Sequence, residues 1–247
     1  SPLGLGNNIF PSNWLNEKKG INIPKLNKYY GEFTGFYWIW KNKIQDLKKE
    51  DMIGFCHYRK LWMNDLYTHK NKSTFKSLYS NLLRINNEIL NTVDAIQVQP
   101  ITFKNKNLFS DFEEVHKTNA LKDCMSFLSI DLKKEFFTHM SGQLLFPHNM
   151  FITKVKHFEE YCAVIFPWLE KCMNYCHEKK LCNDYNMRMP AFLAERFTSY
   201  WFNRFEKKSL LSYARLGKFH LSNNINSYIN TTKLPFTSYQ YPSVHNF

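Results

Sequence analysis

The chain has 247 residues, of which 44% are hydrophobic and 17% aromatic, and this composition supports a sizeable core and excludes a globally disordered protein. The formal net charge of +12 favours an anionic partner, which is a nucleic acid, an anionic membrane surface or a phosphorylated substrate. Because the basic residues are spread along the chain, with no RNP motif, zinc-finger spacing or heptad seam, nucleic acid is the weakest of these partners.

The six cysteines are not needed as disulfide staples in a chain of this size. No signal peptide and no apolar run long enough to span a bilayer is visible, so we expect free thiols in a reducing cytoplasm. Cys172 and Cys176 lie one helical turn apart and could contact a metal. Without a paired Cys/His set at zinc-site spacing, we expect core thiols instead.

Residues 1–26 are rich in Gly, Asn and Pro and are typical of a loop. An α/β domain normally opens on a strand. We therefore expect a single domain over residues 1–247 whose first strand is missing before Ser1.

The next segment, residues 27–43, has aromatic residues at helical spacing, and its apolar arc almost encircles the helix. This pattern predicts a buried helix over Tyr30–Asn42. Gly31 and Gly35, one turn apart, would allow a close approach of another backbone. Glu32 shares this buried neighbourhood, and a buried carboxylate needs a partner, so Glu32 is either an ion-pair member or a site residue.

Residues 52–56 form a short apolar run that predicts a strand covered on both faces. His57, Tyr58, Arg59 and Lys60 follow directly. In open α/β sheets, ligands bind outside the carboxyl ends of the strands, and several basic groups at that position suit a phosphate-bearing ligand. A strand ending in solvated charges is an equally good interpretation of this segment alone.

Further elements follow in alternation, which predicts an α/β fold. We expect a helix around 75–90, a strand over 93–98, two helices within 103–140, a strand over 149–152, an amphipathic helix over 158–180 that Pro167 kinks or splits, a helix over 189–205, and an irregular tail from residue 223.

Three segments together resemble a known family: KYYGEFTGFYWIWKN, IGFCHYRKLW, and NMFITK with a later RMPAFLAERFTSYW. In this order they resemble bacterial capsular and exopolysaccharide glycosyltransferases long described as a domain of unknown function, over about residues 20–205. The family patterns are Y-x-E-x-T-x-x-Y-W-x-W-K-N, G-x-x-H-Y-R-R, N-M-F-I and E-R. Lys60 departs from them, since the family often has a second Arg there.

The resemblance implies a GT-A-like fold with a mixed central sheet flanked by helices and a helical C-terminal part. It also implies transfer of a sugar from a UDP- or GDP-linked donor to a capsular or surface polysaccharide. In GT-A enzymes, the strand after such a helix ends in an Asp-x-Asp motif that holds a divalent metal against the donor diphosphate. The absence of the opening strand would put donor binding in doubt.

Here the basic residues stand where the acidic motif is expected. We therefore expect His57, Tyr58, Arg59 and Lys60 to contact the donor diphosphate and neutralise its developing charge, with Mn²⁺ or Mg²⁺ dispensable. The alternative is that Arg59 is a structural partner of Glu32, and both can hold.

An inverting transferase needs a carboxylate or His to take the acceptor proton, whereas a retaining one does not. Glu195 is the first candidate, with Asp184 and His148 behind it, and His57 is a further catalytic candidate. The structural alternative is an ion pair of Glu195 with a neighbouring arginine.

The residues expected to bind the sugar or the acceptor are Glu32, His148, Asn149, Arg188 and Arg196. Asn149 either donates a hydrogen bond to a sugar hydroxyl or caps the strand that follows it.

The leading hypothesis is thus a cytoplasmic glycosyltransferase at the inner face of an inner membrane, acting on a glycan or lipid-linked glycan. A non-catalytic module that binds a glycan or a protein partner on the same fold is the second hypothesis. A basic nucleic-acid-binding protein is the third, and we expect no nucleic-acid partner.

Overall fold

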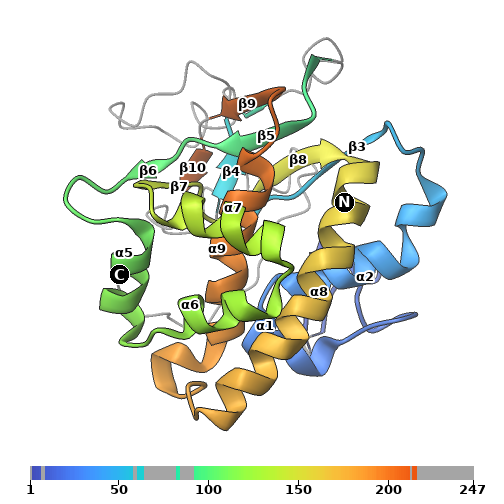
Figure 1. The fold of residues 1–247 in the computed structure, drawn as a ribbon. Helices are drawn as coiled ribbons and strands as arrows, with labels where there is room; N and C mark the ends of the chain where they lie inside the picture. The colour runs from blue at the N-terminus through green and yellow to red at the C-terminus, as the bar shows by residue number, and fades with distance from the viewer. Residues whose placement is uncertain are drawn as a thin grey trace, which may run out of the picture.

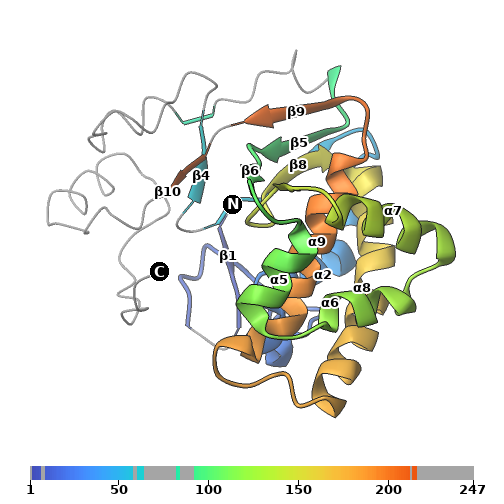
Figure 2. The same cartoon turned by 60° about the vertical axis from the view of Figure 1, so that its left-hand side comes forward.

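The computed structural model describes residues 2–6, 9–57, 60–63, 82–83 and 92–211, and the backbone of 213–215 (Figure 1). The expected helix around 75–90 and the tail from residue 223 lie outside these residues, apart from positions 82 and 83. The part described is a mixed α/β fold in which helices pack under a four-stranded sheet (Figure 2).

The four-stranded sheet has the order β3-β8-β5-β9. Its strands are β3 (Met52–Gly54), β8 (Phe151–Lys154), β5 (Ala95–Val98) and β9 (Lys208–Leu211). β8 runs antiparallel to β3 and β5, and β9 runs parallel to β5. One end of the sheet therefore holds the carboxyl ends of β3, β5 and β9 and the amino end of β8. Polar loops gather at this end.

Three smaller pairings surround this sheet. They join β1 (Leu3–Gly4) to β2 (Leu15–Asn16), β4 (Lys60–Trp62) to β10 (Tyr213–Arg215), and β6 (Ile101–Thr102) to β7 (Leu144–Leu145).

The helices are α1 (Asn27–Tyr30), α2 (Phe33–Asn42), α5 (Leu108–His116), α6 (Ala120–Cys124), α7 (Ile130–Met140), α8 (Val155–Glu178) and α9 (Met189–Asn203). Short 3₁₀ turns lie at Pro24–Leu26, Ile44–Asp46, Met125–Phe127 and Asp184–Arg188. No helix in the described ranges combines the length and the apolar composition needed to cross a bilayer.

The core lies between the sheet, α8 and α9. Phe151 of β8 stacks on Phe202 of α9 at 4.1 Å between ring centroids. Tyr161 of α8 shares a hydrogen bond of 2.6 Å with Thr198 of α9, which satisfies a hydroxyl that is buried completely. The expected mixed sheet and the helices in the C-terminal part are confirmed.

Pro167 does not split α8, which runs unbroken from Val155 to Glu178. Packing compensates for the hydrogen bond that a proline removes, because the ring of the preceding Phe166 lies against Tyr37 and Trp40 of α2 at centroid distances of 5.1 and 5.6 Å.

The expected helix over Tyr30–Asn42 is interrupted. Gly31 has φ 55 and ψ −130, a conformation open to glycine, and it separates α1 from α2. The expected approach of another backbone is not what Gly35 accommodates, because side chains pack there instead: a Cβ would lie 2.8 Å from the side chain of Leu5.

The expectation that the strand over residues 52–56 is covered on both faces was wrong. β3 ends at Gly54, Met52 and Ile53 are half-buried, and Cys56 is exposed. Among the described strands, β3 pairs with β8 alone, so it lies at an edge of the sheet. The fully buried strand is β5.

The segment 103–140 holds three α-helices instead of the two expected. Lys117 adopts a left-handed conformation with φ 55 and ends α5, and the short α6 follows before α7. All six cysteines are free thiols, and four of them, Cys124, Cys162, Cys172 and Cys176, are buried as the core interpretation predicts.

Candidate active site

The Glu32 carboxylate is the centre of a polar cluster at the end of the sheet where β3 ends and β8 begins. Glu32 Oε1 accepts a hydrogen bond of 2.8 Å from Asn149 Nδ2, and Oε2 accepts one of 3.0 Å from Arg188 Nη2. His57 Nε2 lies 3.1 Å from Oε1, an ion-pair distance without hydrogen-bond alignment. One carboxylate thus joins the α1–α2 junction to three other segments.

Gly31 makes room for this arrangement. Its φ of 55 breaks the helix and places Glu32 at the start of α2. A Cβ at Gly31 would overlap the guanidinium group of Arg188, so the absence of a side chain lets Arg188 cross the junction. The glycine therefore serves both the backbone turn and the ion pair.

The pKa of Glu32 reflects two opposed effects. Burial by itself would raise it, but the adjacent His57, the Arg188 charge and the Asn149 amide together lower the pKa to about 2. The carboxylate therefore stays ionised at any physiological pH, and its partners remain fixed.

The loop before β8 carries the second half of the cluster. His148 Nδ1 lies 2.9 Å from Lys60 Nζ, and the backbone N–H of His148 donates a hydrogen bond of 2.7 Å to Glu195 Oε1. His148 and Asn149 have φ values of 78 and 52, which are uncommon for residues other than glycine. Glu195 holds the backbone of this strained pair at His148, and Glu32 holds its side chain at Asn149.

The structure thus brings together seven of the residues singled out in the sequence. They are Glu32, His57, Lys60, His148, Asn149, Arg188 and Glu195. Tyr58 and Arg59 lie outside the described residues, so neither their expected diphosphate contacts nor the expected pairing of Arg59 with Glu32 can be placed.

Of the other two expected residues, Asp184 lies apart from this cluster and Arg196 contacts it through Glu195. Asp184 is exposed at the start of its 3₁₀ turn, and the contact of that turn with the site is made by Arg188 at its other end. Arg196 is buried, and its Nη2 donates a hydrogen bond of 3.0 Å to Asp111 Oδ2 on α5, while its Nη1 lies 3.7 Å from Glu195 Oε2. The arginine of the expected Glu195 ion pair is therefore Arg196, and it lies inside the protein.

Asp111 and its second partner Lys106, which is 3.1 Å away, were not predicted from the sequence. Nothing local marks Asp111 as buried, because an acidic residue in the first turn of a helix is ordinary. The pairing across 85 positions becomes visible once α5 lies against α9.

The donor set does not fit a divalent metal of the Asp-x-Asp kind. The two carboxylates of the cluster already have partners, Glu32 with Arg188 and Asn149, and Glu195 with the His148 backbone. The other groups are cationic or imidazole, and no set of three His, Cys, Asp or Glu residues in the part of the chain described is arranged to hold a metal. These groups suit a phosphate-bearing anion.

Comparisons with known proteins show the family of the chain and a solved structure with a similar fold. The family model described as Domain of unknown function (DUF4422) matches residues 2–208. The fold is similar to a solved structure entitled "WbbM bifunctional glycosytransferase apo structure", with a TM-score of 0.63 and 18% sequence identity over 83% of this chain. The chain spans 40% of that protein. No curated protein has a significantly similar sequence.

The ionised state of Glu32 predicts a pH-dependent stability. A carboxyl with a pKa near 4.3 unfolded and about 2 folded stabilises the fold fully above pH 4.3, by about 3 kcal/mol, and this contribution is lost as the pH falls through 2. Glu32→Gln should therefore unfold more easily than the wild type at pH 6, and the difference should shrink steadily below pH 4.3. Urea unfolding across this range measures it.

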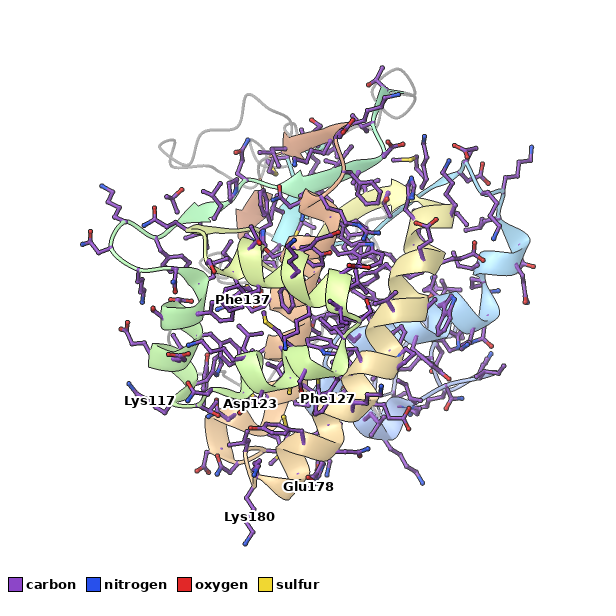
Figure 3. All side chains as sticks on the ribbon, in the orientation of Figure 1. Lys117, Asp123, Phe127, Phe137, Glu178 and Lys180 are labelled. Atoms are coloured by element: carbon purple, nitrogen blue, oxygen red, sulfur yellow. The ribbon has the colours of Figure 1, made fainter. Side chains whose placement is uncertain are left out.

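Glu178→Gln is the matched control, since Glu178 lies at the exposed end of α8 (Figure 3). It should leave the pH dependence unchanged. A difference between Glu32→Gln and the wild type that is the same at every pH would contradict the assignment.

The overlap between Gly31 and Arg188 predicts coupling. Gly31→Ala should destabilise the fold by more than about 1 kcal/mol, because the alanine is strained at φ 55 and displaces Arg188 from Glu32. In an Arg188→Ala background the displacement costs nothing and only the backbone strain remains. A double-mutant cycle should give a coupling energy of about 0.5–3 kcal/mol.

Gly142→Ala provides the comparison for this cycle, because a Cβ there meets only the His139 carbonyl, at 3.1 Å. Its effect on the free energy of unfolding should simply add to that of Arg188→Ala. If the effect of Gly31→Ala also adds to that of Arg188→Ala without coupling, then Gly31 is needed for the backbone turn alone.

Proposed function

The chain belongs to the family described as Domain of unknown function (DUF4422), and we propose that it is a glycosyltransferase with a GT-A-like fold. In this proposal it moves a sugar from a UDP- or GDP-linked donor to a growing capsular or surface polysaccharide. The observation that carries the proposal is the cluster of cationic groups around Glu32 at the carboxyl end of β3.

The cationic groups hold the donor diphosphate. Lys60, His57 and Arg188 come from two segments that meet at the cluster, and Tyr58 and Arg59 belong to the same basic run. As the bond between the sugar and the diphosphate breaks, negative charge grows on the leaving oxygen, and fixed cations stabilise it. Because protein side chains supply this charge, Mn²⁺ and Mg²⁺ are dispensable.

Asn149 contacts the sugar through its carbonyl oxygen. The sequence suggested that its amide donates to a sugar hydroxyl, but Nδ2 donates to Glu32, and Oδ1 has no hydrogen-bond partner. An oxygen turned toward the Glu32 carboxylate would be repelled, so Glu32 fixes the amide orientation. Asn149 therefore accepts a hydrogen bond from a sugar hydroxyl once the loop admits the donor.

Glu195 takes the acceptor proton in an inverting reaction. The acceptor oxygen bonds to the anomeric carbon, the bond to the diphosphate breaks, and the proton passes to the carboxylate. The N–H of His148 holds Oε1, and Arg196 Nη1 lies 3.7 Å from Oε2, so the two contacts together orient the carboxylate. His148 is the other proton acceptor in the cluster. Arg196 acts through its contact with Glu195, and the exposed Asp184 has no direct part.

The acceptor is a glycan or a lipid-linked glycan. The excess of lysine fits an enzyme that works from the cytoplasm beside an anionic inner membrane, where such acceptors are anchored.

Donor binding is the first test. UDP, GDP and their sugars should raise the melting temperature of the wild type for one base and not for the other, with or without Mg²⁺ or Mn²⁺. Lys60→Ala and Arg188→Ala should each weaken binding roughly 10–100-fold, the effect of one lost charge-assisted hydrogen bond. Lys133→Ala, an exposed lysine on α7, is the control.

No stabilisation by any nucleotide would refute the glycosyltransferase proposal, and binding of a glycan alone would then support the non-catalytic module. Stabilisation that appears only with a metal would refute the charge-replacement mechanism and leave the transferase activity standing.

Glu195 has two functions in the proposal, and one substitution separates them. Glu195→Gln keeps an oxygen for the His148 N–H but cannot take a proton. We therefore expect unchanged donor binding and a fall in kcat of about 10²–10⁴. Glu195→Ala should weaken donor binding as well, since the His148 loop loses its anchor. Near-normal turnover in Glu195→Gln would show that Glu195 only positions the loop.

A further inference from the structure

A lysine-rich surface lies at the end of α2 that is away from Glu32. It consists of Lys18, Lys19, Ile21, Lys41 and Lys43, and we call it the α2 basic surface. The loop that carries its first three residues is fixed to the helix, because Asn42 exchanges hydrogen bonds of 2.8 and 2.9 Å with the backbone of Ile21. Trp38 Nε1 also donates to the Lys19 carbonyl. The surface is therefore a rigid part of the fold.

The segment that carries this surface has many more lysines than carboxylates. Between positions 18 and 49 the carboxylates are Glu32, which is held in the site, and Asp46. The lysines of the same segment are Lys18, Lys19, Lys25, Lys28, Lys41, Lys43, Lys48 and Lys49. Lys49 pairs with Glu159 of α8, and Lys25 and Lys28 lie in the 3₁₀ turn and the helix that precede Glu32. Four of the other lysines belong to the α2 basic surface.

An exposed apolar side chain lies on the same loop as Lys18 and Lys19. Ile21 is 58% exposed although its backbone is bonded at both N–H and C=O. A single exposed isoleucine is ordinary, but one that follows two exposed lysines, on a loop bonded to a helix end that carries two more, has the composition of a segment that enters the headgroup layer of a membrane.

The aromatic residues of this surface argue against a nucleic acid as the partner. Lys41 Nζ lies 3.4 Å from the ring centroid of Trp40, and Lys43 Nζ lies 5.9 Å from that of Trp38. Trp38 is also buried. Rings that their own lysines cover, or that the core buries, offer no free face for stacking bases.

We propose that the α2 basic surface docks on an anionic bilayer, with Ile21 inserted between the headgroups and the lysines over anionic lipid phosphates. α2 then links the membrane to the site, because its ten residues span about 15 Å from the Glu32 end to the Asn42 end. This last step rests on the proposed function, since it brings a lipid-linked acceptor within reach of the donor.

Vesicle co-sedimentation tests the surface. The wild type should bind vesicles of phosphatidylcholine mixed with phosphatidylglycerol and should not bind phosphatidylcholine alone. Lys19→Glu/Lys41→Glu/Lys43→Glu should weaken the binding by roughly a hundredfold or more, from about fivefold for each lysine removed. Ile21→Ser should weaken it further and make the remaining binding more sensitive to salt.

The matched control is Lys133→Glu/Lys134→Glu/Lys179→Glu, which changes the net charge equally. Lys133 and Lys134 lie exposed on α7, which packs on α9, whereas α2 packs on α8. The control should keep most of the binding. Equal loss in both triple variants, or equal binding to neutral vesicles, would overturn the proposal, and so would binding of oligonucleotides without vesicles.

The nucleotide-induced rise in melting temperature, measured on the same triple variants, separates this proposal from the proposed function. It should be unchanged in both variants, because none of the substituted lysines contacts the Glu32 cluster. If the protein binds vesicles through this surface but binds no nucleotide, the membrane proposal stands and the glycosyltransferase proposal is refuted.

Discussion

The arrangement of the site depends on the half-buried carboxylate of Glu32 and the contacts that it makes. A charge removed from water is tolerated only when partners compensate for it, and here the partners come from the chain after β3, from the loop before β8 and from the turn before α9. The ion pair therefore fixes three loops relative to one another at the same end of the sheet. Its pKa of about 2 keeps this anchor charged under all ordinary conditions.

α9 extends the same principle into the core. Glu195 and Arg196 are neighbours on this helix and point to different partners, Glu195 to the backbone of His148 and Arg196 to Asp111. The first contact supports the left-handed pair His148–Asn149, and the second ties α9 to α5. A strained loop of this kind persists when the surrounding structure determines it from several sides, as Glu32 and Glu195 do here.

The sequence predicted the elements whose pattern is long or whose burial is complete. α8 and α9 show helical periodicity over many residues, and β5 is an apolar strand in the middle of the sheet. β3 has an equally apolar run but lies at an edge, and composition alone does not distinguish the two positions. The aromatic residues around Gly31 concealed the break between α1 and α2, because apolar periodicity continues across it.

Within the site, the prediction that the Glu32 carboxylate needs a partner was correct, but the sequence did not identify that partner. Asn149 and Arg188 are 117 and 156 positions away, and a contact over such a separation is set by the packing of α2, β8 and α9. The basic run after β3 was visible because its residues are consecutive. Asp111 was not predicted because a buried aspartate and an exposed one in the first turn of a helix have the same local sequence.

The two ends of α2 lie in different environments, and this difference explains the composition of the helix. At its start the helix needs an ionised carboxylate inside the protein, a glycine before it and aromatic residues that exclude water. At its end, lysines cover the tryptophans and stay in solvent. Because packing against α8 through Tyr37, Trp40 and Phe166 holds the helix rigid, the distance between the cationic site and the basic surface is fixed by the fold. In the proposed reaction, an anionic donor held at the first end and a lipid-linked acceptor held in a membrane at the second end would be kept at a set separation.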